Sequence, residues 1–207
     1  MYVLAILGSY LAGSVPFGYL IARAKGVDIR GQGSGNIGAT NVGRILGKAY
    51  GILVFVLDFL KGFGPVLAAR LVGHHLGDSA FVQHDLPVLC GLGAVLGHVF
   101  PVWLRFRGGK AGATGLGVGA ALMWQAMLVA AVIWGIVVAI SRYVSLGTIL
   151  ACIAYVIAYL GWSLFYASPW DREHITMTVF CVLVTSLVVL RHKTNIQRLL
   201  AGTENRI

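Results

Sequence analysis

The chain has 207 residues, of which 58% are hydrophobic and only 11% are charged, against roughly 25% charged residues in a soluble domain. This composition excludes an ordinary soluble globular protein and favours one integral membrane domain over residues 1–207. The formal net charge of +9 indicates anionic partners, either lipid headgroups or phosphorylated substrates. Nucleic acid is not expected as a partner, because no basic stripe with interleaved aromatic residues lies outside the apolar segments.

The first apolar run, Met1–Ala22, contains no lysine or arginine, and Arg23 and Lys25 follow it. A signal peptide carries its positive charge ahead of the apolar region. The run is therefore predicted to be a transmembrane helix whose N-terminus lies outside and whose basic end lies in the cytoplasm.

The next segment, Gly26–Lys48, has seven glycines among its 23 residues. Such a segment cannot form a packed core, but it can bring many backbone N–H groups close to an anion, because glycine adopts positive φ angles readily. The segment is predicted to form one wall of a phosphate-binding site at the membrane surface. Its candidate side chains are Ser34, Asn36, Thr40, Asn41 and Arg44.

The second predicted span, Tyr50–Val72, contains Asp58 and Lys61 one helical turn apart, where they would share a face. Two interpretations of this pair stay open: mutual neutralisation within the membrane, or a functional role, which is the default expectation for ionisable residues in a bilayer. A polar external loop is expected at Gly73–Asp85, and Leu86–Leu104 is predicted to return to the cytoplasm.

A second polar cluster follows the third span. Arg105, Arg107 and Lys110 lie close together, and Gly108-Gly109-Lys110 immediately precedes an apolar run. Flexible backbone and an ammonium group at a helix N-terminus suit an anion, because the helix dipole places partial positive charge there. The sequence therefore predicts a second phosphate cradle.

Gly112-Ala113-Thr114 repeats Gly38-Ala39-Thr40 of the first loop, and each triplet follows a basic, glycine-rich run. A pair of similar anion cradles and a chance match both stay open as explanations. His98, near the end of the third span, is expected to be a hydrogen-bonded packing residue, with catalysis as the alternative.

The run Ala111–Ile140 holds no charge over 30 residues, which is long for one helix and short for two full ones. Charge asymmetry favours two short helices that break near Met123–Gln125, because this places Arg142 on the cytoplasmic side with the other basic residues. The sixth and seventh spans are then predicted at Gly147–Ala167 and Ile175–Leu190.

On this topology 13 of the 16 lysines and arginines lie on the cytoplasmic side. The sequence thus predicts an all-α polytopic bundle with seven transmembrane helices, two of them short, the N-terminus outside and the C-terminus in the cytoplasm. Two further polar clusters would lie on the cytoplasmic face. One contributes Arg142 and Ser145 at a helix start, and the other contributes His192 and Asn195, which are three residues apart in the basic tail.

Several familiar patterns are excluded by their context. Gly33-x-Gly35-x-x-Gly38 matches the dinucleotide-binding fingerprint, but it follows a transmembrane segment instead of a strand. Gly109-Lys110 lacks the upstream glycine and the following Ser or Thr of a P-loop. The six histidines show no metal-ligand spacing with acids or cysteines, so neither a metal nor a cofactor is expected.

Acyl transfer from an acyl phosphate needs phosphate cradles at a lipid surface and little else. The donor is a mixed anhydride with a good leaving group, so the protein must align the substrates, stabilise charge and assist one proton transfer. Four motifs carry a family resemblance: D-I-R-x-x-G-S-G-N-I-G-A-T-N-V-x-R, G-H-V-F-P-x-x-x-x-F-R-G-G-K, S-R-Y-V-S-L-G and R-H-x-x-N-I-x-R-L. Together they strongly resemble the bacterial acyl-phosphate:glycerol-3-phosphate acyltransferase family PlsY over essentially the whole chain.

The resemblance implies a seven-helix membrane enzyme of phospholipid synthesis that acylates the 1-position of sn-glycerol 3-phosphate and releases 1-acylglycerol 3-phosphate and phosphate. It implies catalytic roles for Ser34, Lys110, His192 and Asn195. It implies substrate or phosphate binding by Asn36, Thr40, Asn41, Arg44, Gly108, Gly109, Thr114, Arg142 and Ser145. The substrate phosphate is an alternative to a dedicated base for the proton transfer.

The implied partners are acyl phosphate, sn-glycerol 3-phosphate and membrane lipids, and the implied location is the bacterial inner (cell) membrane with the active site facing the cytoplasm. We expect a monomer, and contact with the enzyme that forms the acyl phosphate stays open. The chain departs from the family pattern G-G-K-G-x-A-T at Ala111. If this position needs a positive φ, alanine costs roughly 1 kcal/mol, and the loop would be shifted or donor affinity weakened.

A transporter of a phosphorylated metabolite is the competing class, and a non-catalytic lipid-binding membrane protein is the third. Transporters place binding groups near the bilayer midplane. Here the polar clusters gather at one face, and only Asp58 and Lys61 lie deep. Lipid binding would explain the basic loops but not four separate clusters of Gly, Ser, Asn and Arg.

Overall fold

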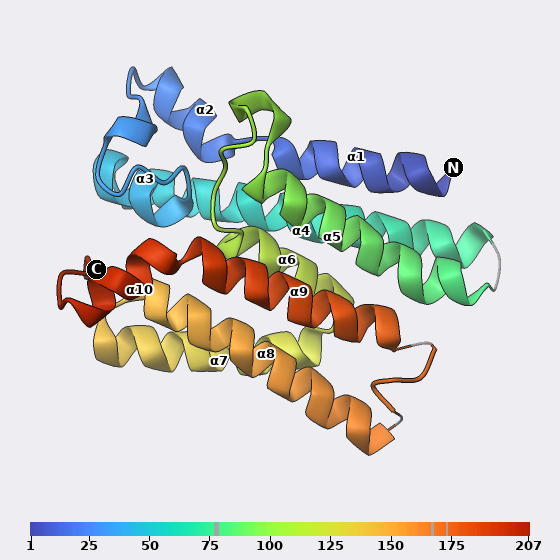
Figure 1. Ribbon diagram of the computed structural model, residues 1–207. Helices are drawn as coiled ribbons and strands as arrows, with labels where there is room; N and C mark the ends of the chain where they lie inside the picture. The colour runs from blue at the N-terminus through green and yellow to red at the C-terminus, as the bar shows by residue number, and fades with distance from the viewer. Residues whose placement is uncertain (77–78, 167, 173) are drawn as a thin grey trace. The chain divides into compact units, whose positions relative to one another are not determined.

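The computed structural model describes residues 1–76, 79–166, 168–172 and 174–207 (Figure 1). Every regular element in these ranges is helical, which confirms the all-α class for the described part of the chain. The elements in chain order are α1 Tyr2–Ser14, α2 Phe17–Ala24, η1 Ile29–Gly31, α3 Ala39–Leu46, α4 Lys48–Leu76, η2 Phe81–Asp85, α5 Leu86–Val99, η3 Val102–Leu104, α6 Gly112–Leu122, α7 Trp124–Ser141, α8 Val144–Tyr166, α9 Ile175–Arg191 and α10 Lys193–Leu200. They form two compact units, Met1–Ala121 (unit 1) and Leu122–Ile207 (unit 2).

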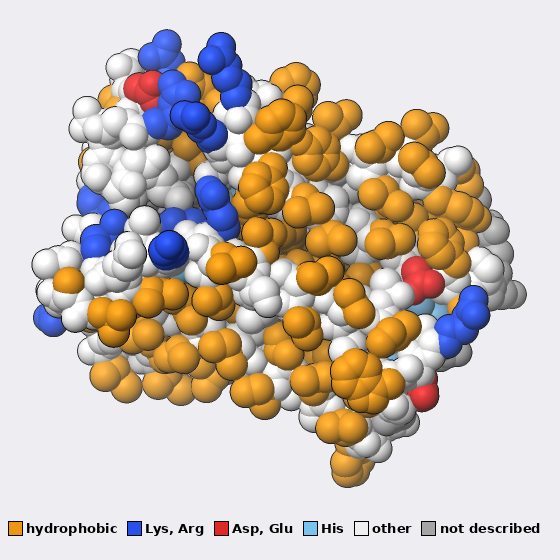
Figure 2. Space-filling view, in the orientation of Figure 1, with side chains coloured by type: hydrophobic (Ala, Val, Ile, Leu, Met, Phe, Trp, Pro, Cys, Tyr) orange, Lys and Arg blue, Asp and Glu red, His pale blue; other side chains and the backbone are white. Residues whose placement is uncertain are grey.

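Several helices have the length and the hydropathy needed to cross a membrane. Among the described residues, five segments are long and apolar enough to cross a bilayer: Tyr2–Ala24, Lys48–Gly73, Phe81–Leu104, Trp124–Ser141 and Val144–Tyr166. The pair α9 and α10, bent by 56°, adds a sixth if it counts as one span. Hydrophobic side chains cover most of the visible helix surface in Figure 2, as expected for helices that face lipid. The predicted integral membrane class is confirmed at the level of five or six spans.

The first span contains a break that the sequence prediction did not include. The sequence predicts one helix over Met1–Ala22, whereas the structure has α1 and α2 with Val15 and Pro16 between them. Val15 is extended, with φ −61° and ψ 115°. Pro16 causes the break, because proline has no N–H and disfavours the helical region for the residue before it. The chain then continues to the first loop, which lies at the end of unit 1 away from the N-terminus (Figure 1).

Helices α1 and α5 pack with their backbones in near contact. A side chain on Gly13 would meet the backbone of Ala94, and a side chain on Gly97 would meet the backbone of Tyr10. Small residues allow membrane helices to approach this closely. The Tyr10 hydroxyl also donates to the Phe100 carbonyl (2.8 Å), so α1 fixes the end of α5 from which the second candidate loop departs.

The polar loop expected at Gly73–Asp85 is only partly a loop. Helix α4 continues through Leu76, and a π-helical turn occupies Phe81–Asp85 ahead of α5. The prediction was wrong at both ends, because polar side chains do not by themselves interrupt the hydrogen bonds of a helix backbone. Even Pro65 is accommodated inside α4.

The uncharged run breaks where the sequence predicts. Helix α6 ends at Leu122, Met123 is extended (φ −151°, ψ 90°), and α7 begins at Trp124. With 11 residues, α6 is one of the short helices that the prediction requires. At 1.5 Å per residue it is too short to cross a full bilayer without distortion.

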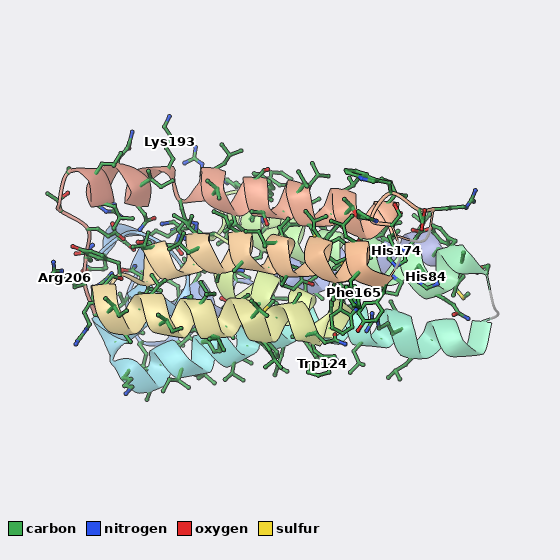
Figure 3. All side chains as sticks on the ribbon, turned by 90° about the horizontal axis from the view of Figure 1, so that it is seen from below. His84, Trp124, Phe165, His174, Lys193 and Arg206 are labelled. Atoms are coloured by element: carbon green, nitrogen blue, oxygen red, sulfur yellow. The ribbon has the colours of Figure 1, made fainter. Side chains whose placement is uncertain are left out.

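Unit 2 consists of α7 to α10. Helices α7 and α8 pack side by side, and Tyr159 of α8 is hydrogen-bonded to Thr178 of α9 (Oη–Oγ1, 3.0 Å). Figure 3 shows Lys193 and Arg206 at one end of this unit and His174 at the opposite end. The unit is therefore polarised, with its basic tail at one end only.

Candidate functional site

The first loop is organised around the side chain of Asn41, which is buried in the first turn of α3. Its Oδ1 accepts the Ser34 N–H (2.9 Å), and its Nδ2 donates to the carbonyls of Gln32 (3.0 Å) and Asn36 (2.9 Å). These contacts use both amide protons. Asn41 therefore holds the loop in shape.

Three predicted side chains lie on the outer surface of the same loop. Ser34, Thr40 and Arg44 are exposed, and the last two are four residues apart in α3, so they share a face. The Asn36 Oδ1 accepts the Gly38 N–H (2.8 Å) and closes the turn before the helix. Hydroxyl groups and a guanidinium on one exposed rim are suited to holding an anion.

At the start of the loop Arg30 is paired internally. Its Nη2 lies 2.7 Å from Asp28 Oδ2, its Nε donates to Asp28 Oδ1 (2.9 Å), and its guanidinium lies over the Tyr19 ring at 4.8 Å. The side-chain hydrogen bond from Arg30, followed by that from its backbone N–H, lowers the pKa of Asp28 to about 2. The ionised carboxylate balances Arg30, so the charge that this loop offers to a ligand is that of Arg44.

The second loop, Phe100–Lys110, folds back onto the end of α5. The N–H groups of Gly108 and Gly109 donate to the carbonyls of Val99 and His98, each at 3.1 Å. A side chain on Gly109 would run into the His98 ring, and one on Gly108 would run into the His98 carbonyl. Close approach thus requires both glycines. Both N–H groups are engaged inside the protein, so this structure does not present them to a ligand.

The side chain that follows the two glycines is Lys110, which is half-buried and lies just before α6. The next residue, Ala111, is fully buried and has a φ of 60°. The positive φ that the sequence raised as a condition is therefore present, and alanine is strained there by roughly 1–2 kcal/mol. Arg105 and Phe106 also have positive φ values of 51° and 62°. Strain of this kind often collects at functional loops.

The two loops of unit 1 share one apolar base. Leu104 of the second loop packs against a buried cluster that lies under the first loop, formed by Ala22, Ile29, Ile37, Val42 and Val54. Thr114, in the first turn of α6, is fully buried, and its Oγ1 lies 3.1 Å from His98 Nδ1. Its hydroxyl faces α5, so this geometry favours a supporting role for Thr114 over direct contact with phosphate.

In unit 2 two of the predicted residues, Ser145 and Asn195, contact Glu204, which the sequence interpretation missed. Its Oε1 accepts hydrogen bonds from Ser145 Oγ (2.8 Å) and Asn195 Nδ2 (2.5 Å), and its Oε2 accepts one from Arg198 Nε (2.7 Å). Glu204 is the only acidic residue in 174–207. A single acid in a basic tail was the signal that could have identified it.

Glu204 stays ionised in spite of its burial. Burial raises its pKa, but hydrogen bonds from Arg198, Asn195 and Ser145 outweigh this effect and hold the pKa below its ordinary value. An anionic carboxylate repels a phosphate instead of binding it. Glu204 therefore acts on a substrate only by fixing the side chains that it gathers.

His192 and Arg142 complete the predicted set. His192 is buried, with its Nδ1 2.8 Å from the Val188 carbonyl. Because a carbonyl oxygen can only accept, Nδ1 carries a proton in this contact. Arg142 is exposed at the end of α7 (φ 64°), and its Nε donates to the Ile207 carbonyl (2.9 Å).

The predicted residues thus fall into two groups. Unit 1 holds Ser34, Asn36, Thr40, Asn41, Arg44, Gly108, Gly109, Lys110 and Thr114, and unit 2 holds Arg142, Ser145, His192 and Asn195. Within the described ranges, no group of three or more His, Cys, Asp or Glu side chains is arranged to hold a metal ion.

Comparison with known proteins gives consistent results. The sequence model of a family described as glycerol-3-phosphate acyltransferase matches residues 3–202. The glycerol-3-phosphate acyltransferase of Desulforamulus reducens is 44% identical over 207 residues, which cover 99% of this chain and 94% of the relative. The protein of the same name from Aquifex aeolicus is 43% identical over 201 residues, which cover 97% of this chain and 96% of the relative.

Solved structures agree with these relatives. The crystal structure of PlsY (YgiH), described as an integral membrane glycerol 3-phosphate acyltransferase in its glycerol 3-phosphate form, aligns with a TM-score of 0.86 at 40% identity. A lysophosphatidic acid form of PlsY aligns with a TM-score of 0.82 at 41% identity. Each alignment covers 100% of this chain and 95% of the solved chain.

Proposed function

Because the chain belongs to the glycerol-3-phosphate acyltransferase family, we propose that it is an acyl-phosphate-dependent glycerol-3-phosphate 1-O-acyltransferase. It transfers an acyl group from acyl phosphate to the 1-hydroxyl of sn-glycerol 3-phosphate and yields 1-acyl-sn-glycerol 3-phosphate (lysophosphatidic acid) and phosphate. This is the first acylation step of phospholipid biosynthesis. Because the chain belongs to a family of acyltransferases, we no longer favour the alternative function, transport of a phosphorylated metabolite.

One observation supports the choice of donor: unit 1 presents cations on two separate loops. Arg44 lies on the exposed rim of the first loop, and Lys110 lies just before α6 at the end of the second, which also carries exposed Arg105 and Arg107. Acyl phosphate and glycerol 3-phosphate each bring one phosphate to the reaction, so two cation-bearing loops match two phosphates. A planar guanidinium suits the phosphate of glycerol 3-phosphate, and we assign Lys110 to the phosphate that leaves.

The chemistry requires little more than alignment and charge stabilisation. The 1-hydroxyl oxygen attacks the acyl carbon, the bond from that carbon to the phosphate oxygen breaks, and phosphate leaves with the electron pair. Lys110 stabilises the charge on that phosphate. The hydroxyl proton is assigned to His192 or, alternatively, to a substrate phosphate. Ser34 and Asn195 are assigned to orienting the reacting groups by hydrogen bonds.

The remaining predicted residues divide by what their side chains already contact. Asn41, Thr114 and Ser145 have polar atoms engaged within the protein and are assigned to positioning. Gly108 and Gly109 allow the second loop to pack on His98. Substrate contact is assigned to Thr40 and Arg44. It is also assigned to Asn36 and Arg142, through side-chain atoms other than the Asn36 Oδ1 and the Arg142 Nε, which bind backbone groups of the protein.

We also propose the membrane arrangement expected from the sequence: one monomeric domain with seven spans in a bacterial inner membrane, the N-terminus outside and the active site facing the cytoplasm. The distribution of 13 of 16 basic residues supports it. Single cysteines at exposed Gly31, Arg142 and Asn205 should be labelled from the cytoplasmic side, and one at exposed Ser79 from outside. Labelling of position 142 from outside would overturn this arrangement.

The donor is tested with purified protein and glycerol 3-phosphate, offering acyl phosphate, acyl-CoA and acyl carrier protein separately. We expect turnover with acyl phosphate only, with lysophosphatidic acid and one phosphate released per turnover. Turnover with acyl-CoA alone would refute the proposed donor while leaving the family assignment intact. Lys110→Ala, assayed in parallel, controls for a contaminating activity.

A further inference from the structure

A buried polar cluster in unit 1 is not used by the chemistry above. It consists of Asp58 and Lys61 on α4, His98 at the end of α5 and Thr114 at the start of α6, each less than a tenth exposed. Lys61 Nζ lies 2.8 Å from Asp58 Oδ1. Charges are costly inside a membrane protein, and a buried pair is weak evidence for stability alone. Its contacts with other elements indicate what it does.

On one side the cluster reaches the break between α1 and α2. Lys61 Nζ donates to the Val15 carbonyl (2.7 Å), and it lies 5.6 Å from the centre of the Phe17 ring. Pro16 interrupts the helix here, and the Val15 carbonyl accepts the Phe17 N–H (3.1 Å) instead of the N–H of a following helical turn. The Lys61 ammonium is a second donor to this carbonyl, at a membrane depth where no water competes for it. Lys61 thereby fixes the point from which α2 leads into the first loop.

On the other side the cluster reaches the second loop. His98 Nδ1 lies 3.9 Å from Asp58 Oδ1 and 3.1 Å from Thr114 Oγ1. The His98 carbonyl accepts the Gly109 N–H (3.1 Å), and the His98 ring packs so closely on Gly109 that a side chain there would collide with it. The backbone just before Lys110 therefore rests on His98, and Thr114 holds the His98 ring in place.

We propose that Asp58, Lys61, His98 and Thr114 form one positioning unit that fixes the two phosphate-binding loops relative to each other. The ion pair holds the helix break that directs the first loop, which carries Arg44, and the His98–Thr114 contact holds the loop that carries Lys110. This inference rests on the proposed function, because it assigns to the cluster the spacing of the two cations. None of the four residues contacts substrate.

The first test is a spectroscopic distance that does not depend on activity. Spin labels are attached at exposed Gly31 and Arg107, one on each loop, in a chain whose Cys90, Cys152 and Cys181 are replaced. Thr114→Val and the pair variant Asp58→Asn/Lys61→Met should broaden or shift the distance distribution. Thr114→Ser, which keeps the hydroxyl, should restore it.

The control is Thr178→Val in unit 2. Thr178 is buried and its Oγ1 donates to the Pro169 carbonyl (2.7 Å), so this variant also loses a buried hydrogen bond. It lies 14 residues before His192, or about 21 Å along a helix. It should lower the melting temperature without changing the distance between the loops. An unchanged distance in both cluster variants, or an equal change in Thr178→Val, would overturn the proposal.

The second test measures coupling to Lys110. A misplacement of about 1 Å can cost up to about 10²-fold in rate, so Thr114→Val should lower kcat/KM by about tenfold or more. In a Lys110→Ala background the same change should have little further effect, because the group that it positions is gone. Equal losses in both backgrounds would make Thr114 structural only and would overturn the proposal.

The pair variant keeps the proposal testable if Thr114→Val does not fold. Replacing both members of a buried ion pair by neutral groups of similar volume is often neutral or stabilising. We expect Asp58→Asn/Lys61→Met to melt no lower than the wild type and still lose about tenfold in kcat/KM. Retention of kcat/KM within about threefold would show that the pair merely neutralises itself. Wild-type turnover in the same assay tests the proposed function separately.

Discussion

In unit 1 an uncharged amide holds the first loop: Asn41 joins three segments of loop backbone through neutral hydrogen bonds. In unit 2 a carboxylate holds two of the predicted residues together: Glu204 accepts hydrogen bonds from the Ser145 hydroxyl, the Asn195 amide and the Arg198 guanidinium. The hydrogen bonds of Asn41 join neutral groups and do not change with pH, whereas those of Glu204 weaken when its carboxylate is protonated. We therefore expect acid to destabilise the Glu204 cluster of unit 2 and to leave the Asn41 loop of unit 1 unchanged.

The two units also differ in what their cationic side chains contact. In unit 2, Arg198 is committed to Glu204 and Arg142 donates to the Ile207 carbonyl. In unit 1, Arg44 is exposed and Lys110 is half-buried at the end of its loop. Arg44 and Lys110 are the two cations that the proposed function assigns to the substrate phosphates. Removing charge should therefore affect catalysis in unit 1 and stability in unit 2, and the following predictions test this contrast.

The largest effect is expected for Lys110→Ala. Loss of a preorganised cation at the leaving phosphate should lower kcat by about 10²–10³-fold without unfolding the protein. Steady-state kinetics and a thermal melt measure the two effects separately. Lys193→Ala removes an exposed lysine from the tail of unit 2 and should leave both unchanged. Activity of Lys110→Ala within a few-fold of the wild type would make this lysine a solvated helix cap.

Glu204→Gln should act on stability. Hydrogen bonds to charged groups contribute about 1.5–3 kcal/mol, and Arg198 is partly exposed, so we expect a loss of about 1–3 kcal/mol in the free energy of unfolding. Because the folded pKa of Glu204 is lowered, its contribution is present above the unfolded value of 4.5 and is lost as pH falls through the folded pKa. Melting temperatures measured from pH 7 to pH 3 should show this loss in the wild type and not in Glu204→Gln.

Asp28→Asn is the matched control for the pH dependence. Asp28 is a partly exposed carboxylate of unit 1 whose pKa is about 2, so any contribution that it makes is lost at a lower pH than that of Glu204. The variant should keep the wild-type loss of stability just below pH 4.5. If Asp28→Asn removed that loss and Glu204→Gln did not, the contrast between the units would be wrong.

A smaller effect is expected for Arg44→Lys, which keeps the charge and removes the planar fork. It should raise the KM for glycerol 3-phosphate by about tenfold, because a point charge cannot replace bidentate contact, and should leave the KM for acyl phosphate nearly unchanged. Varying each substrate separately measures both values. Arg23→Lys, at the end of α2, is the control. An increase confined to acyl phosphate would mean that the two phosphate sites are assigned the wrong way round.

The parts of this fold that could be predicted from the sequence are those set by local composition. Apolar length and the distribution of basic residues identified the spans, and the uncharged run was long enough to reveal the break at Met123. Pro16 was equally visible, but hydropathy alone does not register a break that leaves the segment apolar. A prediction that applied the proline rule to each apolar run would have found it.

The unpredicted parts of the candidate site depend on contacts between distant residues. Ser145 and Glu204 are 59 residues apart in the chain, and no periodicity relates them. Asn41 and Thr114 were singled out from the sequence, yet the sequence could not show that the Asn41 amide and the Thr114 hydroxyl form hydrogen bonds within the protein. Polar residues beside a glycine-rich loop are compatible with ligand binding and with holding the loop. Only the packing distinguishes these roles.

The smallest effect is expected at Ala111, where opposing terms nearly cancel. Ala111→Gly relieves strain of roughly 1–2 kcal/mol at a φ of 60°. It also removes a fully buried methyl group, which costs about 0.8 kcal/mol, and adds backbone entropy to the unfolded chain, which costs about 0.5–1 kcal/mol. The net change should stay within about 1 kcal/mol, or a shift in melting temperature of less than about 4 °C.

The change in stability expected for Ala111→Gly is small, but a comparison with Gly109→Ala makes it informative. Gly109→Ala adds the same methyl group that Ala111→Gly removes, but it drives the group into the His98 ring, so it should lower both stability and kcat/KM. Ala111→Gly should leave kcat unchanged and should not raise the KM for acyl phosphate, because the loop keeps its shape with less strain. A fall in that KM would show that the strain at Ala111 weakens donor binding. A rise would mean that the buried methyl group of Ala111 is what holds this loop in its binding shape.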